Sequence, residues 1–366
     1  MVSRPARLRY SFRLTRSGVL FMSSWSMPSF AGRRRAVLRL LGRSLLALGV
    51  GAAVASYSSA ALARDTVSIG YQRSSTLFIL LKRNGELERR LGALGYDVRW
   101  HEFSSGLLEA MNSGSVDLNA DVADAFALFT QAAHAPLTYY AEETSAPSAQ
   151  AIIVPANSPI HGVADLRGKR VAVAKGSGCH YLLLAALKRA GLAPGDVDIR
   201  YLEASDALAA FRGGNVDAWV IWDPFLAAEQ RDDHVRVIAD GRDGLAEYNR
   251  FYTATDAFVE RHPDALRAVF ELLNQTGKWV KAHPEEAAKI LAPVWGNLPE
   301  ATVTLANSRR SYEIVPVRRD QLAEQQRIAD TYRAAGMIPV AVKATDIRIW
   351  TPGPTGAAAA VKAKAP

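Results

Sequence analysis

Two strand-to-helix turns in this chain carry hydroxyl groups and backbone donors of the kind that can bind a small anion. Lys175-Gly-Ser-Gly178 follows an apolar strand and precedes a helix. The Ser177 hydroxyl and the unpaired N–H groups of the helix start, Gly178 among them, suit oxygen acceptors, although Ser177 is also a common helix cap. Gln72-Arg73-Ser74-Ser75 repeats the pattern after an earlier strand. There Arg73 either adds a fork of donors or is a solvated surface charge.

A third candidate lies at the end of an apolar run, Val216 to Trp222, whose length is typical of a buried strand. The run stops at Asp223 and Pro224. Trp219 and Trp222 are three positions apart and face opposite sides, so we expect one in the core and one on a pocket wall, with both in the core as the alternative. Asp223 can accept hydrogen bonds from a ligand amine or hold a hinge. Ligands bind at this edge of open α/β sheets.

Few residues are arranged for catalysis. The seven His residues form no HExxH motif, no Gly-x-Ser-x-Gly is present, and the Lys175 segment lacks the order of a P-loop. Cys179 next to His180 at a helix start resembles an activated thiolate, but a single cysteine is more often buried and inert. Because Cys179 is the only cysteine in the sequence, cysteine-rich metal sites and an internal disulfide are excluded. We expect no enzymatic activity, no cofactor and no metal.

The net positive charge of the chain comes from its first 63 residues, which hold ten Arg and no Lys, Asp or Glu. Removing those ten from the 44 Lys and Arg leaves 34 basic side chains against 36 acidic ones. The remainder therefore has no basic surface for nucleic acid.

Residues 1–63 have the features of a secretory leader. Arg33-Arg34-Arg35 begins a charged region, Leu45 to Ala55 is apolar, and Ala61-Leu-Ala63 offers a cleavage site. The apolar run is short for a membrane span, so we expect a cleaved signal peptide, with an uncleaved anchor as the alternative. The Sec and twin-arginine export routes both stay open.

Short β-rich runs alternate with amphipathic stretches, which predicts an α/β protein with largely parallel sheets. We expect one helix from Leu77 to Leu91 and, after a strand-like segment at Arg250 to Ala254, a helical chain to about Gly336. Within it, His262-Pro263 and His283-Pro284 open helices. Two lobes, joined by two crossover segments, would close over a ligand like a hinge. Their expected limits are 64–150 plus 254–350 for lobe 1 and 151–253 for lobe 2, with a disordered tail at 351–366.

Several motifs in this order resemble the aliphatic-sulfonate-binding proteins of ABC transporters, beside the taurine and nitrate binders, over about residues 66–350. They are Ile69-Gly-Tyr-Gln72, Ala151-Ile-Ile-Val154, Asn157-Ser-Pro-Ile160, Ala164-Asp-Leu-Arg-Gly-Lys-Arg-Val-Ala172, Lys175-Gly-Ser177, Leu182-Leu-Leu184, Gly214-Asn-Val-Asp-Ala-Trp219, Ile221-Trp-Asp-Pro224 and Phe251-Tyr252.

The resemblance implies a class II periplasmic-binding-protein fold and a monomer that captures a small organosulfonate in a cleft between its lobes. The protein would work in the periplasm, in sulfur metabolism, and deliver the ligand to an ABC permease in the inner membrane. Carried onto the matching positions, the implied ligand-binding residues are Gln72, Ser75, Ser177, Gly178, Trp222, Asp223 and Tyr252.

One segment departs from the family. Where relatives usually carry a Thr-Gly-x-x-Pro-Pro turn, this chain has Asn119-Ala-Asp121-Val-Ala-Asp124-Ala-Phe126. Asp121 and Asp124 would repel a sulfonate unless they face solvent or meet a ligand amine, so an amino-sulfonate or another ligand becomes more plausible. Arg73, Asp121 and Asp124 are therefore further candidate ligand residues.

Other functions remain open at this point. They are an enzyme of the thiamine pyrimidine-precursor type on the same fold, a receptor for nitrate, taurine or another small ligand, and a sensor domain that docks to a membrane kinase. The exported leader and the few His residues disfavour the enzyme.

Overall fold

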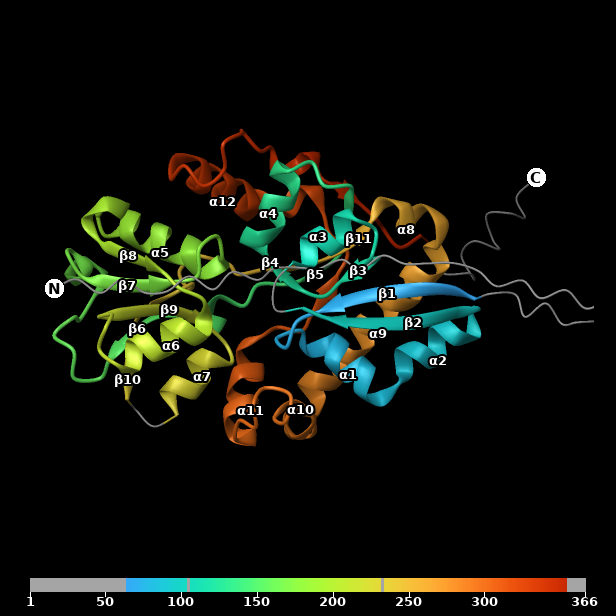
Figure 1. The fold of residues 1–366 in the computed structure, drawn as a ribbon, viewed down its shortest axis with the longest axis horizontal. Helices are drawn as coiled ribbons and strands as arrows, with labels where there is room; N and C mark the ends of the chain where they lie inside the picture. The colour runs from blue at the N-terminus through green and yellow to red at the C-terminus, as the bar shows by residue number, and fades with distance from the viewer. Residues whose placement is uncertain (1–63, 104–105, 232–233, 354–366) are drawn as a thin grey trace, which may run out of the picture. The chain divides into compact units, whose positions relative to one another are not determined.

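The computed structural model describes residues 64–103, 106–231 and 234–353, which form two β-sheets flanked by helices (Figure 1). The predicted α/β class is confirmed. The predicted leader and residues 354–366 of the predicted tail lie outside the described residues. Within the described ranges, the helices are all too short or too polar to cross a membrane.

Sheet A has the strand order β12-β5-β11-β3-β1-β2, with β4 paired to β11 and β13 paired to β5. Its strands are β1 (Asp65–Tyr71), β2 (Tyr96–Glu102), β3 (Leu118–Asn119), β4 (Val122–Ala123), β5 (Leu137–Glu143), β11 (Arg250–Thr255), β12 (Ile314–Val315) and β13 (Arg348–Ile349). β1 runs parallel to β2 and β3, whereas β11 runs antiparallel to β3 and β5.

Sheet B has the order β10-β6-β9-β7-β8. Its strands are β6 (Gln150–Pro155), β7 (Arg170–Val173), β8 (Asp198–Tyr201), β9 (Ala218–Trp222) and β10 (Val235–Asp240). β7 is parallel to β8 and β9, and β6 is antiparallel to β9 and β10. The two sheets share a strand order. β2-β1-β3 in sheet A and β8-β7-β9 in sheet B are three parallel strands, followed in each sheet by the strand that comes from the other sheet, β11 or β6, and then by β5 or β10.

Twelve helices are described: α1 (Thr76–Asn84), α2 (Glu86–Ala93), α3 (Leu107–Asn112), α4 (Asp124–Ala132), α5 (Gly178–Arg189), α6 (Ala204–Arg212), α7 (Phe225–Gln230), α8 (Asp256–Arg261), α9 (Pro263–Ala282), α10 (Pro284–Leu291), α11 (Glu300–Arg309) and α12 (Ala323–Ala334). α5 and α6 cover opposite faces of sheet B (Figure 1). α9 and α10 begin at the predicted His-Pro pairs.

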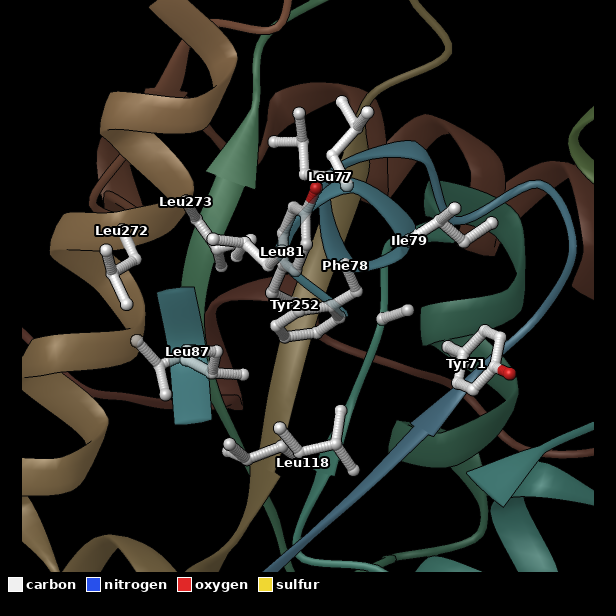
Figure 2. Close-up of a cluster of buried hydrophobic side chains, with 14 of the residues drawn as sticks. Tyr71, Leu77, Phe78, Ile79, Leu81, Leu87, Leu118, Tyr252, Leu272 and Leu273 are labelled. Carbon is white, nitrogen blue, oxygen red and sulfur yellow. The ribbon is translucent and has the colours of Figure 1, made fainter. Parts of the chain in front are cut away.

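The largest apolar cluster packs α1 and α9 against sheet A. Figure 2 shows Leu77, Phe78 and Leu81 of α1 with Leu272 and Leu273 of α9, around the strands. The prediction of one helix from Leu77 to Leu91 is wrong. Gly85 has φ +67°, a left-handed conformation that ends α1 and lets α2 start in a new direction. The helical prediction for the C-terminal half also missed β12.

The chain crosses between the sheets twice. The first crossover, residues 144–149, leads from β5 to β6, and the second crossover, residues 241–249, leads from β10 to β11. β11 pairs in sheet A, although residues 250–253 fell within the predicted lobe 2. The lobe limits themselves stay a prediction.

Candidate functional site

Tyr248 lies where the two crossovers meet. Its buried side chain packs with Ala146 and Ala149 of the first crossover and with the partly buried Trp222 at the end of β9. Its φ of +56° is unusual for a residue other than glycine, and such conformations are held only by the surrounding structure. Tyr248 therefore links the predicted wall residue Trp222 to both crossovers.

The start of α5 reaches the same place. A Cβ built on Gly178 would lie 2.6 Å from Cε2 of Tyr248 and 3.6 Å from Oδ1 of Asp124. Only glycine fits at this contact, because real Cβ atoms do not approach ring carbons so closely. Two predicted site residues, Gly178 and Asp124, are thus brought to Tyr248.

Ser177 caps α5. Its Oγ accepts a hydrogen bond from the His180 N–H (3.2 Å) and donates one to the Ala174 carbonyl (2.8 Å). The capping interpretation is therefore observed, and contact with a ligand stays a prediction. The neighbouring Cys179 is buried, and burial raises the pKa of its thiol well above the usual value, which disfavours a reactive thiolate.

In the turn at Gln72 to Ser75, the polar groups of Ser75 bond to Gln72 of the same turn. Ser75 is buried, and its Oγ accepts a hydrogen bond from the Gln72 N–H (3.1 Å) while its own N–H donates to the Gln72 carbonyl (2.9 Å). Arg73 is exposed and its Nε lies 3.1 Å from Glu102 Oε1 on β2. The Arg73 guanidinium is therefore engaged at the surface by a carboxylate.

Arg310 joins the start of α1 to two buried acids. Its Nη1 lies 3.3 Å from Thr76 Oγ1, its Nη2 2.7 Å from Asp121 Oδ2, and its Nε 2.9 Å from Glu143 Oε1. Burial by itself lowers the pKa of Arg310, but the Glu143 and Asp121 carboxylates outweigh it, so the net pKa lies well above the usual value. The guanidinium is charged at any physiological pH.

Arg250 continues this network to Tyr248. Its Nη1 lies 3.4 Å from Asp121 Oδ2, its Nη2 lies 3.3 Å from the Tyr248 hydroxyl, and its guanidinium carbon lies 4.8 Å from the centre of the Tyr248 ring. Burial raises the pKa of Asp121 against the opposing effect of the two guanidinium groups. Buried contacts therefore run from Thr76 at the start of α1 to Gly178 at the start of α5.

The remaining two acids also have partners within the chain. Asp124 accepts hydrogen bonds from the N–H groups of Ala125 (2.8 Å) and Asn249 (3.0 Å), which ties α4 to the second crossover. Asp223 receives Arg309 Nη1 on both oxygens, at 2.9 and 3.1 Å. Burial raises the pKa of Asp124 to about 7 and that of Asp223 to about 6. Asp121 and Asp124 are therefore buried with partners in the protein instead of facing solvent, and contact of either residue with a ligand stays a prediction.

The predicted aromatic residues Trp219, Trp222 and Tyr252 lie in different surroundings. Trp219 is buried in the core beside Phe211 and Phe225, whereas Trp222 is only partly buried. Tyr252 is 1% exposed and packs in the sheet A cluster against Phe78 (Figure 2). Its ring also packs against Tyr140. The structure therefore brings Trp222, but not Tyr252, to the Tyr248 junction.

Unused hydrogen-bonding atoms remain near this junction. Both polar side-chain atoms of Gln150 and the Nε of Arg250 are buried without a hydrogen-bond partner among the described residues. Gln150 lies opposite Trp222 in the antiparallel register of β6 and β9, so the two side chains share a face of sheet B. Buried polar groups normally have partners, which makes these atoms candidates for ligand contact. Over the same described ranges, no cluster of His, Cys, Asp or Glu could hold a metal ion.

The sequence interpretation missed Tyr248, Arg250, Arg310 and Gln150. The only local signal was the Arg309-Arg310 pair, two charges inside an otherwise ordinary amphipathic stretch. The other three lie at the ends of crossovers, where no periodic pattern marks a residue.

Comparison with known proteins agrees with this architecture. Residues 98–287, about half of the chain, match the family described as NMT1/THI5 like. An aliphatic sulfonates-binding protein of Escherichia coli is 37% identical over 322 residues, which cover 87% of this chain and 97% of the relative. A Bacillus subtilis protein of the same description is 30% identical over 72% of this chain and 80% of its own.

Two solved structures have the same fold. The periplasmic aliphatic sulphonate binding protein of Escherichia coli aligns with a TM-score of 0.73 at 37% identity, over 79% of this chain and 93% of that one. The alkanesulfonate-binding protein of Xanthomonas axonopodis pv. citri, solved bound to MOPS, aligns with a TM-score of 0.70 at 35% identity, over 76% and 95%. The predicted periplasmic-binding-protein fold is confirmed.

Proposed function

The chain belongs to the NMT1/THI5-like family, and on that premise we propose that it is the aliphatic-sulfonate-binding component of an ABC importer. It captures a small alkanesulfonate between sheets A and B and delivers it to a membrane permease. It acts as a monomer in the periplasm, after residues 1–63 have served as a cleaved signal. Its relatives at 30% identity or more are named as binding proteins, which supports a protein without catalytic activity.

The observation that carries the proposal is the unpartnered amide of Gln150, opposite Trp222, together with the unpartnered Nε of Arg250, whose guanidinium contacts Tyr248. A sulfonate presents three acceptor oxygens, which suit an amide donor, a guanidinium donor and the N–H groups at the start of α5. Trp222 and the Tyr248 ring supply apolar surface for the alkyl chain. Ser177 and Gly178 then contact the ligand through the backbone of the α5 start.

The other predicted residues take supporting roles in this proposal. Gln72 and Ser75 close the opposite turn over the ligand, and Tyr252 supports that turn from the core. Asp121 holds Arg250 in place, and Asp124 and Asp223 fix the second crossover and the end of β9. Arg73, paired with Glu102, is left out of the site.

Tryptophan fluorescence tests the proposal. Ethanesulfonate and longer alkanesulfonates should change the emission of Trp222 on binding, and taurine, nitrate and sulfate form the comparison panel. Gln150→Leu should weaken sulfonate binding by roughly 1–3 kcal/mol, the value of a hydrogen bond to a charged group. The exposed Gln275→Leu is the matched control. A wild-type protein that responds to nitrate or sulfate but to no alkanesulfonate would contradict the assignment.

A further inference from the structure

A cavity of about 350 Å³, which Trp222 does not line, lies where both crossovers approach the start of α12. Its wall includes Glu142 at the end of β5, Glu247 and Asn249 of the second crossover, Val315 of β12, and Glu324 and Arg327 of α12. The cavity volume suits a small organic molecule.

Glu142 is a buried carboxyl group without a partner. It is 6% exposed, and within the described residues its side chain makes no hydrogen bond and no ion pair. The next side chain, Glu143, is directed to Arg310, whereas Glu142 lies in register with Phe251 and Val315. Because Val315 lines the same cavity, the Glu142 carboxyl is directed into it. A buried carboxyl group that lacks a partner normally awaits one.

The charges on the cavity wall do not balance. Glu324 accepts a hydrogen bond from the Glu247 N–H (3.0 Å) and forms an ion pair with Arg327, which leaves that guanidinium engaged. Within the described part of the chain, the Glu142 and Glu247 carboxyls have no cation. The described residues contain no cluster of side chains that could hold a metal ion, whereas a primary ammonium has three N–H donors that can reach both carboxylates.

We propose that this cavity is a second ligand site, which binds a small primary ammonium ion through the carboxylates of Glu142 and Glu247. A bound ammonium contacts β5, the second crossover and, through Glu324, α12. It therefore links the segments that must move when sheets A and B close on a sulfonate. The site is separate from the sulfonate site and does not depend on that assignment.

The geometry implies a pH dependence. Burial raises the pKa of Glu142 to about 7, and the other charged groups that line the cavity are Glu247, Glu324 and Arg327. Nearby Asp124, whose pKa is also raised to about 7, is turned to Ala125 and Asn249. Ammonium binding requires the ionised Glu142, so affinity should fall about tenfold between pH 8 and pH 6.

Isothermal titration with ethanolammonium chloride at pH 8, against sodium chloride of equal ionic strength, tests the proposal on the full chain. Wild type and the control Glu300→Gln, which removes an exposed acid, should bind ethanolammonium. Glu142→Gln should lose at least tenfold in affinity while it retains ethanesulfonate binding, which also shows that the variant is folded. Wild type that binds no ethanolammonium at millimolar concentration overturns the proposal. Equal binding by Glu142→Gln, or equal affinity at pH 6 and pH 8, does so too. If wild type binds ethanolammonium but not ethanesulfonate, the sulfonate function alone is refuted.

Discussion

At the scale of single residues, the acids around the junction are supports for the site. Asp121 lies between two guanidinium groups, Asp124 accepts two backbone N–H groups, and Asp223 binds Arg309. A buried carboxylate is costly without such partners. An anionic ligand then meets paired carboxylates, so the acidic segment does not by itself argue against a sulfonate.

Gly178 is the residue with the least room for change. In Gly178→Ala the new Cβ would meet the Tyr248 ring at 2.6 Å, so either the ring or the start of α5 must move. We expect a loss of roughly 1–3 kcal/mol in the free energy of unfolding, measured by urea denaturation, and weaker ethanesulfonate binding. Gly195→Ala is the control, because a Cβ added at Gly195 would have no atom within 4 Å. Unchanged stability in Gly178→Ala would show that the contact relaxes freely.

Glu142 predicts how stability depends on pH. Its folded-state pKa of about 7 lies above that of an unfolded glutamate, so the folded state holds its proton more tightly. The free energy of unfolding should therefore fall as pH rises from about 4.5 to 7, by roughly 3 kcal/mol from this group. Glu142→Gln removes this term and should gain on wild type at pH 8 but not at pH 4.5, in urea denaturation. A constant difference between the two proteins across this pH range would contradict the assignment.

Residue chemistry could be predicted only where the sequence keeps it local. Ser177, Gly178 and Trp222 stand next to recognisable strand ends, and the structure brings Gly178 and Trp222 to one junction. Arg310 and Asp121 are 189 positions apart in sequence. Their pairing is set by sheet order, which no spacing reveals, so the sequence could not predict that Asp121 has an arginine partner.

At the scale of elements, Arg309 connects α11 to sheet B. It ends α11 and binds Asp223 at the end of β9, and its Nη2 also lies 2.5 Å from Gln230 Oε1 at the end of α7. α11 packs against α10, which belongs to the sheet A cluster. The ion pair is mostly buried, with side-chain exposures of 15% and 3%. It is therefore a direct link between helices of the two sheets.

Arg309→Ala should destabilise the protein by roughly 3–5 kcal/mol, because it leaves Asp223 buried and unpaired. Urea denaturation measures the loss, and Arg333→Ala on α12, which removes an exposed guanidinium, is the control. Adding Asp223→Asn to Arg309→Ala should recover part of the stability, since no buried charge is then left alone. A double variant less stable than Arg309→Ala would show that the Asp223 carboxylate acts instead through the hydrogen bond that it accepts from the Ala227 N–H.

Long elements with a clear period could be predicted, and short ones could not. β9 ends at Trp222 as predicted, β11 lies within a residue of the predicted Arg250 to Ala254, and α9 and α10 start at their proline residues. β12 has two residues and owes its pairing to β5, so it has no period of its own. The apolar period of residues 77–91 continues across Gly85, which hid the break in the helix.

At the scale of the molecule, two sheets that share the order of five strands are joined by crossovers that meet at Tyr248. Both proposed ligands touch this region, the sulfonate beside Trp222 and the ammonium beside Glu142 and Glu247. If closure moves the crossovers, each ligand changes the affinity for the other by the same factor. The shared contact with the crossovers is the physical basis for such coupling.

Sulfonate binding should therefore stabilise the crossovers as well as the site. Ethanesulfonate at 100 times its dissociation constant should raise the free energy of unfolding by about 2.7 kcal/mol, and the melting temperature by roughly 5 °C. Hydrogen exchange should slow at residues 144–149 and 241–249, because closure fixes backbone that is free to open in the unliganded protein. The strand β7, which is buried within sheet B, should change little and serves as the internal reference. Gln150→Leu at the same ethanesulfonate concentration should show a smaller effect in both crossovers. Slower exchange at the start of α5 alone, with unchanged crossovers, would mean that the ligand binds to sheet B without hinge closure.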